Sequence, residues 1–199
     1  AATFAGALSA AAGITNTSGA GTFTTAATTV AAEYGGGVDH ITKLTLTAFS
    51  VGNQADNADL AIGAEVYTFP AGDLIIYDST IRGAFSTTAS VTTVADGEYG
   101  MGTLIASGAV DTLSEVGATA ENIMTGQAIS THVMDGTTVV VVATSTGDTP
   151  SAQGLVVLSA AGLAHKLFLN IAATWPNVDP SPLAVSFTGV ITVRWRKIS

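Results

Sequence analysis

The 199-residue chain contains no cysteine, so disulfide bonds, thiolate zinc sites, iron–sulfur clusters and cysteine nucleophiles are excluded. Only 11% of its residues are charged, which is less than half of the roughly 25% found in an average domain. Hydrophobic residues make up 47% of the chain and the mean hydropathy is +0.47. A chain of this length and composition can bury one core, so it does not fit the composition of a disordered protein.

Positive charge is especially scarce. Six Lys and Arg residues stand against fifteen Asp and Glu residues, which gives a formal net charge of -9. An acidic protein repels phosphate backbones and anionic lipid headgroups, so we expect neither nucleic acid nor a membrane as a partner. The longest purely apolar run, Val139–Ala143, is far shorter than the roughly eighteen residues of a membrane-spanning helix.

Residues that could perform catalysis are few and scattered. The three histidines, His40, His132 and His165, lack a second histidine at metal-ligand spacing. No Gly-x-Ser-x-Gly nucleophile motif and no Walker-type phosphate loop occurs. We therefore expect no enzyme, no cofactor and no bound metal. The carboxylates Asp56 and Asp59 lack the pattern of an EF-hand and are interpreted as a solvated loop, with a calcium site at a subunit boundary as the alternative.

The first 32 residues carry no charge and consist mainly of Ala, Thr, Gly and Ser. Their large apolar residues are too sparse to order the segment by themselves. We interpret residues 1–37 as a low-complexity N-terminal arm with a glycine hinge, and residues 38–199 as one domain. The arm is either a floppy terminus or a segment docked on its own body or a neighbouring subunit. The candidate inter-subunit contacts are Phe4, Leu8, Ile14 and Phe23.

Beyond the arm, short runs rich in β-branched residues alternate with Gly, Asp, Asn and Pro, which is typical of strands and turns. Strands are expected over residues 41–49, 64–69, 74–86, 90–94, 102–110, 137–144, 154–159, 165–175 and 183–197. In the first of these, Leu44 and Leu46 alternate with Thr and Lys, as in a strand with one buried face. Exposed Thr keeps such a surface polar without charge.

The last expected strand has the clearest period of two. Apolar residues alternate with Ser, Thr and Arg from Leu183 to Trp195, and the length of the run predicts a bend or bulge at Gly189. Arg194 and Arg196 would face away from Trp195, which separates the cations from an aromatic stacking surface. We interpret the arginines as protecting a sheet edge, or as partners of an acidic residue in another subunit.

Helical spacing is confined to residues 111–124, where one short helix is possible although Gly117 weakens it. Asp39 and His40 are adjacent and would point to opposite faces of a strand, so His40 is interpreted as a polar residue at a strand start. Frequent turns without intervening helices predict an all-β fold. The expected architecture is an antiparallel β-sandwich of jelly-roll type with an extended N-terminal arm.

Five segments of the chain together have a familiar pattern: DHITKLTLT (39–47), VYTFPAG (66–72), GTLIASGAV (102–110), ENIMTGQ (121–127) and LFLNIAATW (167–175). They resemble small β-rich virion proteins of tailed, especially marine, bacteriophages. The resemblance covers about residues 33–199 and carries no catalytic residue. It implies a decoration or cement protein on the capsid surface of a virion, bound in many copies to the phage major capsid protein. A homo-oligomer, with a trimer favoured, is the expected state.

Two other functions remain open at this point. A jelly-roll major capsid protein would form the shell itself. A receptor- or carbohydrate-binding module of a phage fibre would need a surface cluster of aromatic residues, and those available are Tyr34, Tyr67, Tyr77, Tyr99 and Trp175. A charge-poor surface favours repeated protein contacts, because few charges lose their hydration when two such surfaces meet.

Overall fold

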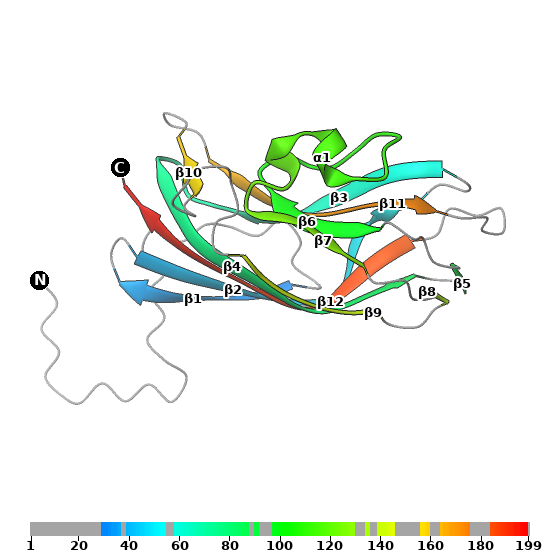
Figure 1. Cartoon of the computed structure of the whole chain (residues 1–199). Coiled ribbons are helices and arrows are strands. Elements are labelled where there is room, and N and C mark those ends of the chain that lie inside the picture. Colours follow the sequence, from blue (N-terminus) through cyan, green and yellow to red (C-terminus); the bar gives the residue numbers. More distant parts are fainter. Residues whose placement is uncertain are drawn as a thin grey trace, which may run out of the picture.

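The computed structural model describes residues 29–36, 39–54, 58–87, 90–91, 97–129, 134–135, 139–145, 156–159, 164–175 and 184–198. The expected arm contacts Phe4, Leu8, Ile14 and Phe23 lie outside the described residues. Within them the chain forms two large antiparallel sheets packed face to face, with very little helix (Figure 1). The expected all-β sandwich is confirmed.

The strands are β1 Thr29–Gly36, β2 Asp39–Asn53, β3 Ala58–Thr68, β4 Leu74–Thr87, β5 Ser90–Val91, β6 Glu98–Gly102, β7 Met124–Ala128, β8 Met134–Asp135, β9 Val139–Ser145, β10 Val156–Leu158, β11 Lys166–Trp175 and β12 Ala184–Lys197. The helical elements are α1 Leu113–Val116 and the 3-10 turn η1 Ala118–Ala120. The larger sheet has the order β1-β2-β12-β4-β10, and β9 also pairs with β4. The smaller sheet has the order β3-β11-β6-β7. β5 and β8 form a separate two-stranded sheet.

The order in which strands pair within the two sheets is nested. β2 pairs with β12, β3 with β11, β4 with β9 and β6 with β7, and every pair is antiparallel. Along the chain, the first of these eight strands therefore pairs with the last, the second with the second-last, and so on to the innermost pair. Successive pairs alternate between the larger and the smaller sheet until the innermost pair. One long antiparallel ribbon, rolled up on itself, has this arrangement.

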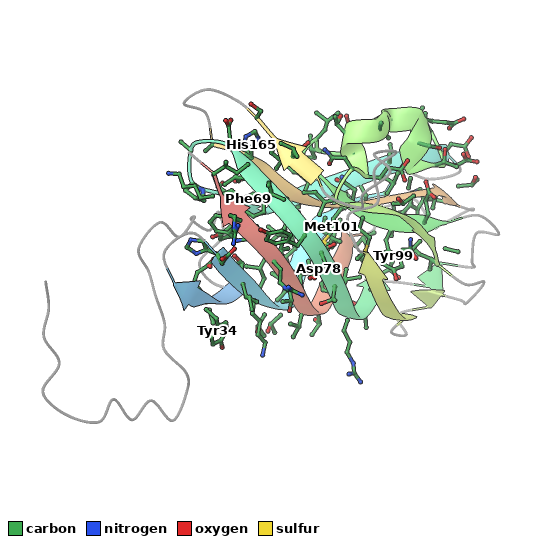
Figure 2. All side chains as sticks on the ribbon, turned by 60° about the vertical axis from the view of Figure 1, so that its left-hand side comes forward. Tyr34, Phe69, Asp78, Tyr99, Met101 and His165 are labelled. Carbon is green, nitrogen blue, oxygen red and sulfur yellow. The ribbon has the colours of Figure 1, made fainter. Side chains whose placement is uncertain are left out.

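The core lies between the two sheets, where Figure 2 shows Phe69 and Met101. β12 contributes the fully buried residues Val185, Phe187, Ile191, Val193 and Trp195. β11 contributes Leu167, Leu169, Ile171, Ala173 and Trp175 from the other side. Both sets occupy alternate positions, so the period of two expected for β12 is confirmed.

A β-bulge changes the inward face of β2. Its buried positions are even-numbered up to Leu46 and odd-numbered from Phe49 onward. The register with β12 shifts between Phe187 and Gly189, which is where the length of the run predicts a bulge. The extra residue is in β2, where Ala48 has a φ of 47°. This left-handed conformation is uncommon for a residue with a side chain.

Seven of the nine expected strands overlap β2, β3, β4, β9, β10, β11 and β12. The expected strand at 90–94 is described only as β5, and its residues 92–94 lie outside the described part of the chain. The expected strand at 102–110 is wrong, because β6 ends at Gly102 and the residues after it form bends. β7 and β8 were not expected from the sequence; β7 has Gly126 at its centre, and β8 has only two residues.

A buried asparagine explains why residues 103–110 do not form a strand. Asn170 of β11 is fully buried, and its side chain bonds three backbone groups of the segment that crosses the smaller sheet. Its Oδ1 accepts the Ala106 N–H at 2.9 Å, and its Nδ2 donates to the carbonyls of Leu104 and Ala120 at 2.9 and 2.7 Å. These bonds satisfy backbone groups that strand pairing would otherwise satisfy.

The helix expected over 111–124 is shorter than its range. α1 ends after Val116, and Gly117 has a φ of 126° that favours glycine. The 3-10 turn η1 follows, and Met124 already belongs to β7. Gly117, which weakens the helical pattern in the sequence, is thus the position where the helix stops.

β1 lies within the segment expected to be an arm. Its residues 29–36 pair antiparallel with residues 39–46 of β2, so the larger sheet begins before the expected boundary at residue 37. Composition misplaces this boundary because it averages over the uncharged residues and overlooks Glu33, whose side chain is buried in the sandwich.

Two glycines face each other where β4 pairs with β12. Gly83 is in register with Gly189, and a Cβ on Gly189 would lie 2.4 Å from the carbonyl oxygen of Arg82 and 2.7 Å from Cζ of Phe187. The Phe187 ring covers the glycines and packs on Phe85, with ring centroids 5.0 Å apart. The aromatic pair can lie over the sheet only because both positions lack side chains.

We expect Gly189→Ala to lower the free energy of unfolding by about 2–4 kcal/mol, because backbone and a buried ring occupy the space for the new methyl group. Urea unfolding measures the loss. Val190→Ala, on the half-buried opposite face, is the matched control and should cost about 1 kcal/mol or less. Equal losses in the two variants would contradict the close approach at the glycine pair.

Candidate functional site

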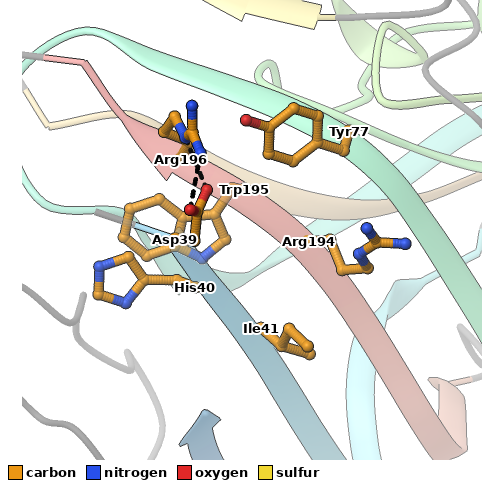
Figure 3. Close-up of a pocket in the computed structure, with 7 residues that line it drawn as sticks. All are labelled: Asp39, His40, Ile41, Tyr77, Arg194, Trp195 and Arg196. Atoms are coloured by element: carbon orange, nitrogen blue, oxygen red, sulfur yellow. Dashed lines mark hydrogen bonds and ion pairs between the residues drawn. The ribbon is translucent and has the colours of Figure 1, made fainter. Parts of the chain in front are cut away.

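A hollow of about 390 Å³ lies on the outer face of the larger sheet, where β2 begins and β12 ends (Figure 3). Its lining residues are Asp39, His40, Ile41, Tyr77, Arg194, Trp195 and Arg196. They come from the three adjacent strands β2, β12 and β4. Segments at opposite ends of the described chain therefore build one surface.

Strand alternation divides the lining residues between the outer surface and the core. Asp39 is exposed on the outside, whereas the next residue, His40, is 3% exposed. Arg194 and Arg196 are likewise exposed, and Trp195 between them is fully buried. The expected opposite orientations of Asp39 and His40, and of the arginines and Trp195, are confirmed.

Two ion pairs lie on the outer face. Arg196 donates from Nε and Nη2 to the two carboxylate oxygens of Asp39 at 2.6 and 2.7 Å, and Arg194 donates from Nη1 to Asp78 at 2.8 Å. The hydrogen bond from Arg196 lowers the pKa of the Asp39 carboxyl. The interpretation of these arginines as edge protection is wrong, because β12 lies between β2 and β4 inside the sheet. The alternative, an ion pair with another subunit, is wrong as well, because both carboxylate partners belong to the same chain.

A row of larger side chains crosses this face. Tyr34 of β1 is in register with Ile41, which is in register with Arg194, and Figure 2 shows Tyr34 on the outer side of the sheet. Tyr77 lies at the irregularity in the register of β4 with β12, next to Asp78. Ile41 is 38% exposed. The hollow therefore offers an apolar side chain and an aromatic ring beside paired charges.

The aromatic residues available for a carbohydrate site do not gather on the surface. Tyr67, Tyr99 and Trp175 are 0%, 3% and 1% exposed. Tyr34 and Tyr77 are partly exposed on the outer face of the larger sheet. Of the five aromatic residues available for such a cluster, only Tyr34 and Tyr77 therefore reach the surface.

A buried polar network lies beneath the hollow and joins the two sheets. Oε1 of Glu33, on β1, accepts hydrogen bonds from Oγ1 of Thr42 at 2.5 Å and from Oη of Tyr67 at 2.6 Å. Nε1 of Trp195 donates to Oγ1 of Thr42 at 2.8 Å. Tyr67 belongs to β3 of the smaller sheet, so the network fixes edge strand β1 to both layers.

His40 completes this buried cluster through ring contact. Its imidazole stacks on the Trp195 indole with centroids 4.1 Å apart and an angle of 8° between the planes. Nδ1 lies 3.7 Å from Oε2 of Glu33, and within the described residues neither ring nitrogen has a hydrogen-bond partner. The interpretation of His40 as a polar strand-start residue did not include this burial. The sequence contains a signal for it, because His40 lies an even number of residues before Leu44 and Leu46 and so points to the same face of the strand.

The opposite side of the sandwich carries a second distinct surface, which we call the acidic cap. It comprises residues 103–123, which cover the outer face of the smaller sheet (Figure 1). Its charged residues are Asp111, Glu115 and Glu121, and it contains no Lys or Arg. Glu98 of β6 lies beside it. Burial raises the pKa of the Glu98 carboxyl, the hydrogen bond from the Leu113 N–H opposes this, and neighbouring Glu121 and Asp111 raise it further.

Two apolar side chains of the cap are exposed to solvent. Leu104 and Ile105 are 44% and 42% exposed, whereas Ala106 is buried. The Leu104 N–H donates to the Thr119 carbonyl at 3.1 Å, and its own carbonyl accepts from Asn170. The exposed pair is therefore held by hydrogen bonds at both the N–H and the carbonyl of Leu104, one to the Thr119 backbone and one to the Asn170 side chain.

Within the described ranges, no group of three or more His, Asp or Glu side chains could hold a metal ion. The loop residue Asp56 lies outside the described residues, and its neighbour Asp59 is exposed on β3. Of the described helices, none is long and apolar enough to cross a membrane.

Neither a scan against models of known protein families nor a search of curated proteins finds a match for this chain. The function is therefore inferred from the arrangement of the chain's own residues, above all the outer face of the larger sheet and the acidic cap.

We expect Glu33→Leu to lower the free energy of unfolding by about 2–4 kcal/mol, because it removes the acceptor of two buried hydroxyl groups. Urea unfolding gives the loss, and amide hydrogen exchange of β1 shows whether the edge strand opens. Glu33→Gln keeps a carbonyl acceptor and should lose less than half as much. Equal losses for Leu and Gln would show that the hydrogen bonds of Glu33 do not hold β1.

The raised pKa of Glu98 gives a pH-dependent prediction. Folded Glu98 holds its proton more tightly than the unfolded side chain, whose pKa has the ordinary value of 4.5. As the pH rises above that value, the wild type should therefore lose stability relative to Glu98→Gln. Gln keeps an acceptor for the Leu113 N–H and carries no charge. Urea unfolding from about pH 4 to pH 7 measures the difference between the two proteins, which should grow and then level off; a constant difference would refute the prediction.

Proposed function

We propose that this protein is a viral structural protein, a decoration or cement protein that binds in many copies to a phage capsid and stabilises it. The observation that supports this most is the nested pairing of eight strands in two sheets. We propose that this arrangement is a jelly roll, a double-sheet architecture used by viral capsid domains and by lectins. Because a fold alone does not determine function, the surfaces carry the rest of the proposal.

The outer face of the larger sheet suits contact with other proteins. Among the described residues, no helix covers it (Figure 1). Its exposed positions are rich in threonine, including Thr45, Thr47 and Thr188. The two arginines at the hollow are already paired with carboxylates, so less charge has to lose hydration when a partner covers this face.

The uncharged N-terminal residues support a role in assembly. Residues 1–28 precede β1, which is an edge strand of the larger sheet. A chain that enters a sheet at its edge can extend over an adjacent subunit, and its apolar side chains can anchor it there. The proposed anchors are Phe4, Leu8, Ile14 and Phe23. We favour a homo-oligomer such as a trimer, bound on the virion surface to the major capsid protein.

The alternative within the same architecture is a jelly-roll major capsid protein, which forms the shell itself. A second alternative is a receptor- or carbohydrate-binding module of a phage fibre. The hollow favours it, because Tyr77 stands there beside two guanidinium groups and the exposed side chain of Ile41. Ligand sites commonly combine an apolar or aromatic wall with a few oriented polar groups.

Purified virions of the phage that encodes this chain test the proposal. We expect mass spectrometry to find the chain in many copies per particle, and mild chaotrope to release it while electron microscopy still shows intact capsids. If the capsid falls apart when the chain is released, the chain is the shell protein instead. Its absence from virions, together with saccharide binding that Tyr77→Ala abolishes, would favour the fibre-module alternative.

Deleting residues 1–28 tests the role of the arm while keeping β1 and Glu33. We expect the unfolding free energy to change little, because the described core is intact, and the mass from light scattering to fall toward that of one chain. Rebinding to stripped capsids should weaken as well. A full-length control with Phe4, Leu8, Ile14 and Phe23 replaced by serine should behave like the deletion. Unchanged mass and unchanged capsid binding would refute the arm proposal.

A further inference from the structure

The few basic residues of the chain gather on one sheet. Five of the six, Lys43, Arg82, Arg194, Arg196 and Lys197, lie on the adjacent strands β2, β4 and β12. The sixth, Lys166, pairs with Glu65 on the smaller sheet at 2.6 Å.

The register places Lys43 and Arg82, which have no ion-pair partner among the described residues, on the same outer face as the hollow. Lys43 is opposite Thr192 and Arg82 is opposite Val190, and residues 190, 192, 194 and 196 of β12 share one side of the sheet. Both Lys43 and Arg82 are exposed. Because Arg194 and Arg196 are neutralised by carboxylates, Lys43 and Arg82 supply the excess positive charge at the centre of this face.

The acidic cap lies on the opposite side of the sandwich and carries the other sign. No Lys or Arg occurs between residues 83 and 165. In the described part of that stretch, the carboxylates of Asp111 and Glu121 lie close enough to Glu98 to raise its pKa. Glu115 is exposed on α1. The chain thus has a positive sheet face and a negative cap, despite its low content of charge.

The apolar features of these two surfaces are complementary as well. The cap exposes Leu104 and Ile105, and the hydrogen bonds of Asn170 keep this segment against the smaller sheet. The sheet face has a hollow of about 390 Å³ in which Ile41 and Tyr77 offer apolar surface. An apolar projection on one side of a molecule and a complementary hollow on another can join copies head to tail.

We propose that the outer face of the larger sheet binds the acidic cap of a second copy of this chain. Leu104 and Ile105 of one copy enter the hollow of the next, and the carboxylates of the cap face Lys43 and Arg82. The two surfaces differ, so the contact is heterologous and joins copies head to tail, in a row or a closed ring. This inference deepens the proposed function and rests on it for the purpose of assembly in many copies.

Charge reversal on each surface tests the contact. The sheet-face variant carries Lys43→Glu and Arg82→Glu, and the cap variant carries Asp111→Lys and Glu115→Lys. Sedimentation velocity of the full chain at an ionic strength of about 0.15 M is suitable, because there the net charge is screened beyond about 8 Å. We expect each variant alone to self-associate about tenfold or more weakly than the wild type, since like charges then face each other.

Mixing the two variants is the decisive measurement. Every contact in the mixture can again join opposite charges, so association should return toward that of the wild type. If net charge governed association instead, the cap variant would associate more strongly than the wild type, because its charge is less negative than -9. That result, or a mixture that stays dissociated, would overturn the inference.

The apolar part of the contact has a matched control. Leu104→Ser with Ile105→Ser should weaken association about tenfold or more. Ala128→Ser changes an exposed residue on β7, which belongs to neither surface, and should leave association unchanged. Equal effects of the cap and β7 substitutions would overturn the inference.

Three further outcomes separate this inference from its alternatives. A wild-type chain that stays monomeric yet rebinds stripped capsids would overturn the contact between copies and leave the decoration function standing. A sheet-face variant that keeps wild-type self-association and loses affinity for a single-stranded oligonucleotide would overturn the inference and assign the face to nucleic acid. Association without capsid binding would support the contact and count against decoration.

Discussion

The register between β2 and β12 is the constraint on which both faces of the site depend. His40 pairs with Trp195 and Asp39 pairs with Arg196, so one alignment stacks the two rings inside and joins the two charges outside. A slip of one residue would turn the arginines into the core and the indole toward solvent. The bulge opposite Gly189 shifts β2 by one residue, so the apolar residues of β2 point into the core on both sides of the bulge.

The buried network shows why the edge strand β1 belongs to the sandwich. A carboxylate loses its hydration when it is buried and needs hydrogen bonds in return. Oε1 of Glu33 receives two, from Thr42 of its own sheet and Tyr67 of the other. Trp195 then donates to Thr42, which connects the network to the centre of the larger sheet. One charged residue thus positions the strand that connects the uncharged N-terminal residues to the domain.

Local pattern predicted what depends on neighbours along one strand and missed what depends on distant partners. The alternation in β12 and the register shift beside Gly189 follow from residues that are adjacent in sequence. By contrast, residues 102–110 have the composition of a strand, but distant partners hold part of them in another conformation, above all Asn170, some sixty residues later. The hollow could not be foreseen either, because it requires the register that places Asp39 beside Arg196. The buried role of Glu33 could not be predicted for a similar reason, because its hydrogen-bond partners lie on β2 and β3.

The low charge content makes the position of each charge consequential. In a surface with many charges of both signs, a few cations on one sheet would be averaged out over a Debye length of about 8 Å. Here the described carboxylates of this face, Asp39 and Asp78, pair with Arg196 and Arg194, so Lys43 and Arg82 set the sign of the outer face of the larger sheet. Asn170 has the complementary effect on the other side, because it fixes the backbone from which Leu104 and Ile105 project. The two surfaces lie on opposite layers of the sandwich, so the contact that we propose between them would continue from copy to copy instead of closing on a single pair.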